Sequence, residues 1–253
     1  MVQLKALYKL APSLAIKYFK NKKNQSTWDW YEMWQDAHKK SFTVAKAVNE
    51  KVLNEIRTAI DDALENGKTF HQFQKELKPL LQKRGWWGEQ IVVDSNGVAE
   101  KVQLGSMYRL KTIYSVNMQV AYQTGRYTTQ IENAEDRPYW EYVAILDSST
   151  RPEHAMLNGM VFRYDDPFWK SFYPPNGWRC RCRVNALSQY KVDKSKITIS
   201  DSNGKLSDEL QLVSKKSGEY KPIKVYTDSL TGKRIATDVG WSHNPATGLI
   251  DSE

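Results

Sequence analysis

Apolar positions in the first third of the chain follow a helical period. They recur every fourth residue, at Val44, Val48, Val52, Ile56, Ile60 and Leu64. This spacing places them on one face of a helix. Gly67 is a candidate C-cap, and Thr69 with Gln72 has the pattern of a capping box that opens a second helix. We therefore predict that residues 28–84 are largely helical and contain a helical hairpin.

The pattern changes after residue 84. The segment Gly85-Trp-Trp-Gly88 interrupts the helices. After it, two apolar runs at residues 91–93 and 98–104 flank Ser95-Asn-Gly97. An Asn-Gly pair between such runs is typical of a tight β-hairpin. A broad apolar helical face then returns over residues 106–132. The first half is therefore expected to be mainly helical with one β-hairpin.

The second half alternates short strands and a short helix. Residues 139–146, 160–164 and 180–187 are rich in aromatic and β-branched side chains and predict strands. A short helix is predicted from Pro152 to Asn158-Gly159, and a loop rich in Pro and aromatic residues at 165–178. These elements predict a compact mixed module at residues 138–190.

The fold class expected from these patterns is α+β, with a helical N-terminal part preceding the mixed module. The expected domains are a basic arm and linker at 1–27, a mainly helical domain at 28–137, the module at 138–190 and a polar extension at 191–253. The extension carries a candidate hairpin around Thr231-Gly232.

The basic arm supports two interpretations. Residues 1–23 carry six lysines and no acidic residue, and their apolar positions have roughly helical spacing, interrupted by Pro12. Such a segment is either a docking helix of the fold itself or a segment that binds a partner protein or nucleic acid. The candidate partner-binding residues are Lys5, Lys9, Lys17 and Lys20.

Charge, cysteine spacing and hydropathy limit the partners and the cellular compartment that we expect. A net charge of +8 favours an acidic partner, such as nucleic acid, a membrane surface or an acidic protein, without choosing among them. The two cysteines are separated by one residue, so a disulfide between them is strained and a reducing compartment is expected. No run of about 18 apolar residues and no signal-peptide pattern occurs, so no membrane association is expected.

Both cysteines lie near one histidine in a chemically rich stretch. His154, Cys180 and Cys182 are ligand types that zinc prefers, with Asp147 as a candidate fourth ligand. The sequence thus allows a structural zinc that stabilises the module. The alternative is a pair of buried thiols beside a histidine that is hydrogen-bonded to Asp147.

Two catalytic hypotheses use the same residues. Cys180 and His154 could act as nucleophile and base, with Arg179 and Arg181 lowering the thiol pKa. A metal-independent nuclease would instead use Asp147, Arg151 and His154. The chain has no phosphate-binding Walker loop, Gly-rich dinucleotide turn or His-Glu-x-x-His motif.

Basic residues around the cysteines suggest contact with DNA. On a strand, Arg179, Arg181 and Arg183 would alternate with the cysteines and form one basic stripe, with Lys170 nearby in sequence. Basic and aromatic side chains together suit sequence-independent contact with phosphates and bases. The alternative is internal pairing of these arginines with Asp147, Glu153, Asp165 and Asp166.

Several motifs together resemble the Mu F-like family of phage minor head proteins, also called head-morphogenesis proteins. The resemblance covers about residues 28–190, and the chain segment at 240–245 resembles the family more weakly. Its motifs are Gly85-Trp-Trp-Gly88, the helix from Arg109 to Tyr127, Arg137-Pro-Tyr-Trp-Glu-Tyr142, Asp147-Ser-Ser-Thr-Arg-Pro-Glu-His154, Leu157-Asn-Gly159, Asp166-Pro-Phe-Trp169 and Pro174-Pro-Asn-Gly-Trp-Arg-Cys-Arg-Cys182.

The resemblance implies a minor head protein of a tailed phage or prophage that acts with the portal at the DNA-entry vertex. It implies the portal, other head proteins and non-specific double-stranded DNA as partners, no small-molecule substrate and no enzymatic activity. The protein would be made in the host cytoplasm and incorporated into the virion. It also implies a metal-binding set, in which Arg151 stands where other members carry a ligand. The alternative is a nuclease or transferase-type toxin carried in the head.

Overall fold

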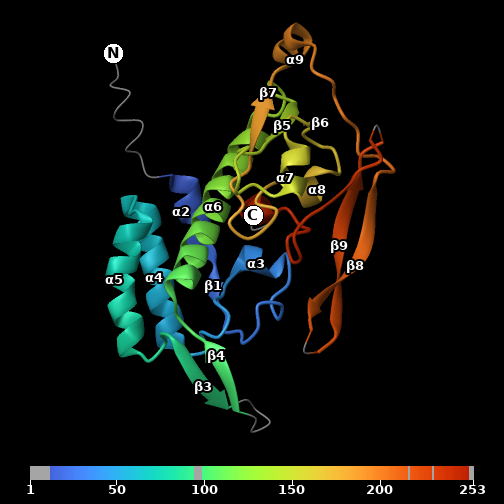
Figure 1. The fold of residues 1–253 in the computed structure, drawn as a ribbon. Helices are drawn as coiled ribbons and strands as arrows, with labels where there is room; N and C mark the ends of the chain where they lie inside the picture. Colours follow the sequence, from blue (N-terminus) through green and yellow to red (C-terminus); the bar gives the residue numbers. More distant parts are fainter. Residues whose placement is uncertain (1–11, 94–98, 216, 230, 251–253) are drawn as a thin grey trace, which may run out of the picture. The chain divides into compact units, whose positions relative to one another are not determined.

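The computed structural model describes residues 12–93, 99–215, 217–229 and 231–250. The chain divides into two compact units: unit 1 comprises residues 1–33 and 40–121, and unit 2 comprises residues 34–39 and 122–253. Helix α6 (Met107–Glu132) runs through the division (Figure 1). Helices and several small sheets are both present, which confirms the predicted α+β class. None of the helices in the described segments has the length and hydropathy needed to cross a bilayer.

Unit 1 contains the predicted helical hairpin. Helices α4 (Glu50–Asn66) and α5 (Phe70–Lys83) lie side by side (Figure 1). Gly67 ends α4 in the left-handed conformation with φ +63°, and the Thr69–Gln72 capping box opens α5, both as predicted. The apolar faces of the two helices are buried, which stabilises the pair by removing apolar area from water.

The predicted helix does not extend back to residue 28. Residues 28–49 contain only the short helix α3 (Ala37–Lys40) and the strand β2 (Ser41–Phe42), which pairs in parallel with β1 (Lys23–Asn24). Helix α4 begins after Asn49, whose side chain accepts a hydrogen bond from the amide of Lys51 at 2.9 Å. Val44 and Val48, the first two residues of the predicted apolar face, therefore lie outside the helix, and Val48 is 53% exposed.

The described part of the predicted arm belongs to the core of unit 1. Helix α2 (Ser13–Asn21) buries Ala15, Tyr18 and Phe19, and the ring of Phe19 meets that of Phe42 edge-on at 5.4 Å. Lys17 and Lys20 are exposed, and Lys20 forms an ion pair with Glu65 of α4. Lys5 and Lys9 lie outside the described residues. The docking-helix interpretation therefore holds for α2.

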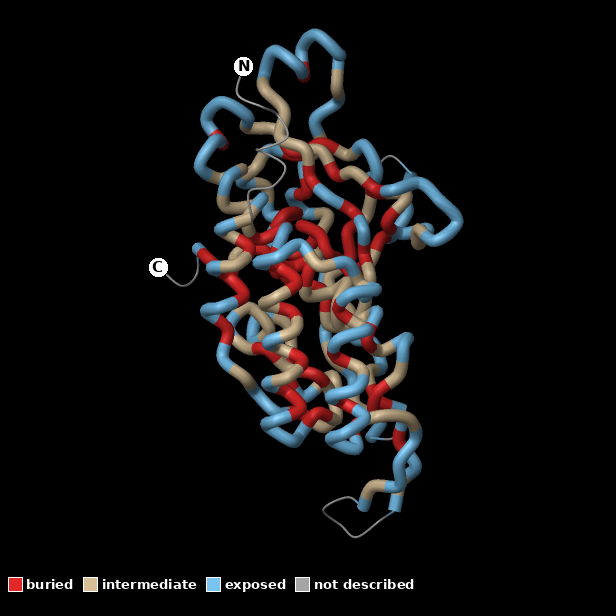
Figure 2. Tube along the Cα trace, turned by 90° about the vertical axis from the view of Figure 1, so that its left-hand side faces the viewer, coloured by how far each residue is buried: buried red, intermediate tan, exposed pale blue. Residues whose placement is uncertain are grey.

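A two-stranded hairpin completes unit 1. Strands β3 (Glu89–Val93) and β4 (Ala99–Gln103) are antiparallel, as predicted, whereas the predicted Asn-Gly turn lies outside the described residues. Most of the hairpin's residues are exposed (Figure 2). At its base, Gly105 lies so close to Trp86 that a Cβ there would come within 2.5 Å of the Trp86 carbonyl oxygen. The tryptophan in turn donates from Nε1 to the carbonyl of Lys46 at 2.8 Å.

Unit 2 is built on a three-stranded antiparallel sheet with the order β6-β5-β7. Its strands are β5 (Tyr139–Val143), β6 (Val161–Arg163) and β7 (Arg183–Leu187). Helix α7 (Pro152–Leu157) connects β5 to β6, α8 (Trp169–Phe172) lies in the predicted loop between β6 and β7, and α9 (Gln189–Ser195) follows β7. This arrangement agrees with the strands and the short helix predicted for residues 138–190.

Aromatic side chains fill the core of this unit. Side chains along β5 point alternately into and out of the core, so Trp140 and Tyr142 face inward and are fully buried. From α6, Tyr127 meets Trp140 and Tyr173 edge-on at 5.6 Å and 4.9 Å. Phe168 stacks on Phe162 at 4.1 Å. Edge-to-face and offset contacts of this kind add to the free energy of burial.

The C-terminal residues share this core. Strands β8 (Leu206–Ser214), β9 (Glu219–Thr227) and β10 (Arg234–Ala236) form a second antiparallel sheet in the order β10-β9-β8, and the 3-10 helix η1 (Pro245–Gly248) follows. The pairing of β9 with β10 confirms the predicted hairpin, whereas β8 was missed. Tyr226, Ile235 and Ala246 pack into the same cluster as Trp140. The expected boundary at residue 190 therefore does not coincide with a break in the core.

Candidate functional site

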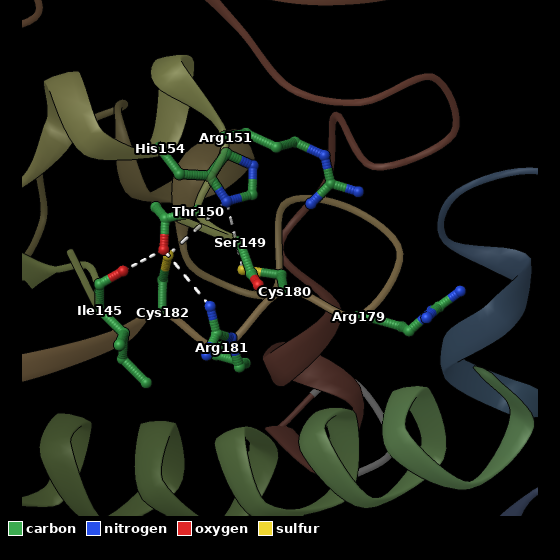
Figure 3. Close-up of a pocket in the computed structure, with 9 residues that line it drawn as sticks. All are labelled: Ile145, Ser149, Thr150, Arg151, His154, Arg179, Cys180, Arg181 and Cys182. Carbon is green, nitrogen blue, oxygen red and sulfur yellow. Dashed lines mark hydrogen bonds between the residues drawn. The ribbon is translucent and has the colours of Figure 1, made fainter. Parts of the chain in front are cut away.

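Three side chains of unit 2 converge on one point. His154 lies on α7, and Cys180 and Cys182 lie on the segment just before β7. Nδ1 of His154 is 3.6 Å from the Sγ atom of each cysteine, and the three side chains are buried (Figure 3). They line a cavity of about 10 Å³ together with Ser149, Thr150 and three arginines. Such a volume suits one ion or one water-sized group.

Helix α7 is held at both ends, which positions His154. Pro152 occupies the first turn of α7, where its missing amide proton costs no helical hydrogen bond. At the other end, the side chain of Asn158 accepts a hydrogen bond from the amide of Ala144 at 2.9 Å. Gly159, with φ +81°, donates from its amide to the carbonyl of Tyr142 at 2.8 Å. The helix is thereby fixed to the end of β5.

The cysteine segment is fixed by two buried polar side chains. Asn176 accepts a hydrogen bond from the hydroxyl of Tyr142 at 2.8 Å and donates to the carbonyls of Ser171 and Tyr173. Gln123 of α6 donates to the carbonyl of Cys182 at 2.9 Å. Buried hydrogen bonds such as these favour one conformation of the chain. The two thiols therefore occupy positions determined by β5 and α6.

The two thiols differ in acidity. The interaction with Cys182, together with burial, raises the pKa of the Cys180 thiol. The same interaction lowers the pKa of Cys182 to about 7, assisted by Tyr142 and by the positive charges of Arg181 and Arg151. Burial raises the pKa of the Tyr142 hydroxyl well above its usual range. Cys182 is thus the more acidic thiol of the pair.

The neighbouring charges are paired with each other. Arg181 binds Asp147 through both guanidinium nitrogens, at 2.7 Å and 2.5 Å, and these bonds hold the pKa of Asp147 well below its usual range. Arg151 contacts Asp238 at 2.9 Å and donates to the carbonyl of Trp178 at 2.9 Å. Asp147, the candidate fourth ligand, therefore faces Arg181 and is not part of the three-residue cluster.

The structure does not form the predicted strand-borne basic stripe. Strand β7 begins at Arg183, so Arg179 and Arg181 precede it, and Arg179 has a left-handed φ of +57°. This turn breaks the alternation, and Arg179 extends away from the thiols (Figure 3). Arg181 is paired with Asp147, as the internal-pairing alternative expected. Arg183 and Lys170 are exposed and, among the described residues, form no ion pair.

The positions of these residues can be compared with what each of the two catalytic hypotheses requires. A nucleophilic Cys180 needs a lowered pKa, but the lowered pKa of the pair lies on Cys182, whose Sγ is also 3.6 Å from Nδ1 of His154. The nuclease hypothesis needs Asp147 and Arg151 to converge on His154. They are instead engaged by Arg181 and Asp238. Among the described residues no side chain hydrogen-bonds Nε2 of His154, so the ring lacks the third group that orients a catalytic base.

Some residues near the cluster could not be predicted from any pattern in the sequence. Asp238 is 84 residues from His154 along the chain and lies in a polar stretch, yet its carboxylate reaches Arg151. A Cβ at Gly177 would come within 2.2 Å of the Asp238 carboxylate, so this close approach requires glycine. Tyr142 could have been found, because alternation along β5 directs it to the same face as Trp140.

Comparison with known proteins identifies relatives over nearly the whole chain. The "Putative capsid assembly protein F" of Escherichia phage Mu is 43% identical over 259 residues, which cover 97% of this chain and 56% of that protein. The "Mu-like prophage FluMu F protein" of Haemophilus influenzae is 43% identical over 229 residues, covering 90% of this chain and 54% of that protein. The chain thus spans about half the length of these relatives.

No solved structure matches the chain significantly. Residues 54–185 match the family described as "Phage Mu protein F like protein". This match covers more than half of the chain, runs from within α4 to within β7, and includes His154, Cys180 and Cys182. The chain therefore belongs to the Phage Mu protein F like family.

Proposed function

We propose that this chain is a head-assembly protein of a tailed phage or prophage, which docks at the portal vertex and contacts packaged DNA. The observation that carries the proposal is the 43% identity, over 97% of the chain, with a protein named for capsid assembly. The protein acts in the head interior or at the portal vertex, after synthesis in the host cytoplasm. Its partners are the portal and other head proteins.

The charge of the chain supports the DNA part of the proposal. The net charge is +8, and Arg183 on β7 and Lys170 on α8 are exposed. Exposed cations bind duplex DNA through phosphates and displace condensed counterions, which gives affinity without base specificity. Arg181 contributes less to such binding, because Asp147 already neutralises it.

Co-purification with the portal tests the assembly role. The full chain is co-expressed with the portal and major head proteins of the same phage, and assembled heads are separated by sedimentation. We expect the chain in the head fraction and in complexes captured through a tagged portal. A variant lacking residues 1–11 keeps α2 and the described core, so it tests the basic N-terminal residues alone and should enter heads less efficiently. Heads that form normally without the chain would contradict the proposal.

A further inference from the structure

We propose that His154, Cys180 and Cys182 bind one zinc ion. The side chains bring together one imidazole nitrogen and two sulfur atoms, all within 4.8 Å of one another and all buried. This inference is independent of the role in head assembly, because it concerns only the chemistry of the cluster.

The distances in the cluster fit a tetrahedral centre. Zinc is held at about 2.0 Å from imidazole nitrogen and about 2.3 Å from thiolate sulfur, so tetrahedral angles separate the nitrogen and sulfur atoms by about 3.5 Å. Both Nδ1–Sγ distances are 3.6 Å. A hydrogen bond to one sulfur explains one of these distances. Two equal distances are what a common central ion requires.

The orientation of His154 supports the same conclusion. His154 is 3% exposed, and Nδ1 is the ring nitrogen that contacts both sulfur atoms, so it points into the space between the thiols. A neutral imidazole with its ring proton on Nε2 presents the Nδ1 lone pair to the space between the thiols. That lone pair is the group that binds a metal.

The charges around the cluster accommodate a divalent ion. Each thiol releases its proton to solvent on binding, so two thiolates and one Zn²⁺ add no net charge to a buried site. The adjacent arginines, Arg151 and Arg181, are balanced by Asp238 and Asp147. A mixed sulfur and nitrogen set also favours zinc over magnesium or calcium, which prefer oxygen. The cluster supplies three of the four positions of a tetrahedral ion, and the described residues place no fourth His, Cys, Asp or Glu ligand beside it.

Bound zinc would link α7 to the segment that precedes β7. The ligands are 26 residues apart in sequence, from His154 to Cys180, and the ion would close this loop in the folded state. Because the site exists only in the folded chain, binding energy becomes folding energy. The ion would therefore stabilise unit 2.

Metal analysis of the full chain tests the proposal. Protein produced in zinc-supplemented medium and dialysed against metal-free buffer should retain about one equivalent of zinc, the occupancy expected of a structural site. Removing the zinc with a chelator and adding Co²⁺ should produce the near-ultraviolet thiolate-to-cobalt charge-transfer band and the visible bands of a tetrahedral ion. Cys182→Ser should lose the zinc and weaken the charge-transfer band.

The control is His71→Ala, which removes an exposed histidine of α5 and should leave zinc content unchanged. If Cys182→Ser does not fold, cobalt titration of the wild-type chain and of His154→Gln gives the answer. Wild-type protein without zinc and without a cobalt charge-transfer band would overturn the proposal. Zinc retained at full occupancy by both Cys182→Ser and His154→Gln would also overturn it, because the ion would then lie elsewhere.

Discussion

Lys22 couples the stability of unit 1 to pH. Its ammonium is buried at the end of α2, where it donates to the hydroxyl of Tyr18 at 3.1 Å and lies over the Tyr18 ring. Burial, assisted by the charge of Arg57, lowers its pKa from 10.5 to about 7. Below pH 7 the lysine is charged in both folded and unfolded chains, so the folded state bears the full desolvation cost. As pH rises from about 7 towards 10.5, the folded chain loses this proton first and the cost declines.

We therefore expect Lys22→Met to raise the free energy of unfolding by roughly 1–3 kcal/mol at about pH 6, and by much less at about pH 10. Urea unfolding followed by circular dichroism at both pH values measures the difference. Lys17→Met, an exposed change on the same helix, is the control and should have little effect at either pH. An equal gain at both pH values would show that Lys22 is not desolvated in the folded protein.

At the scale of elements, the turn between α4 and α5 depends on the backbone conformation of Gly67. Its φ is +63°, and a Cβ built there has no atom within 4 Å. Gly67→Ala should therefore lower the free energy of unfolding by about 1 kcal/mol through backbone strain, without any steric clash. Gly67→Asn should lower it less, because asparagine adopts the left-handed region more readily. Thermal or urea unfolding of the two variants checks the order, and equal stability of Ala and wild type would contradict it.

At the scale of the whole molecule, the net charge of +8 predicts salt-dependent binding of DNA. Each phosphate contact contributes about 0.9 to the log–log slope of affinity against salt. Replacing Lys170 and Arg183 with Gln should reduce the slope by about 2 and leave base preference unchanged. Arg181→Gln is the matched control, since Asp147 already neutralises Arg181, and it should change the slope less. Fluorescence anisotropy with duplexes of different sequence measures these slopes.

The same assay distinguishes the head-assembly role from the toxin alternative. We expect the DNA to remain intact throughout, with and without divalent metal, because none of the described residues orients His154 as a catalytic base. Cleavage that His154→Ala abolishes would favour a nuclease. Binding that does not respond to salt would remove DNA from the partners and leave protein docking alone.

Helices and strands could be predicted from the sequence where their ends and faces are marked by residues close together in the chain. The ends of α4 and α5 follow from Gly67 and the Thr69–Gln72 box, and the strands of the module follow from alternation around Trp140. These features depend on residues a few positions apart, so a pattern in the chain records them directly. The same reasoning gave a wrong prediction at Val44 and Val48. These residues follow the helical spacing of apolar positions, but they precede α4, which begins only after its N-cap Asn49.

Contacts between residues far apart in the sequence depend on the packing of the folded chain. Sequence reasoning selected His154, Cys180 and Cys182, but their equal 3.6 Å separations depend on how α7 and the segment before β7 are fixed to β5 and α6. It could not show that Asp147 would bind Arg181, or that Asp238 would reach Arg151. Several cations compete for each carboxylate, and the path of the folded chain determines which pair forms. The burial of Tyr226 and Ile235 with Trp140 has the same origin, because a shared core is made by contacts far apart in sequence.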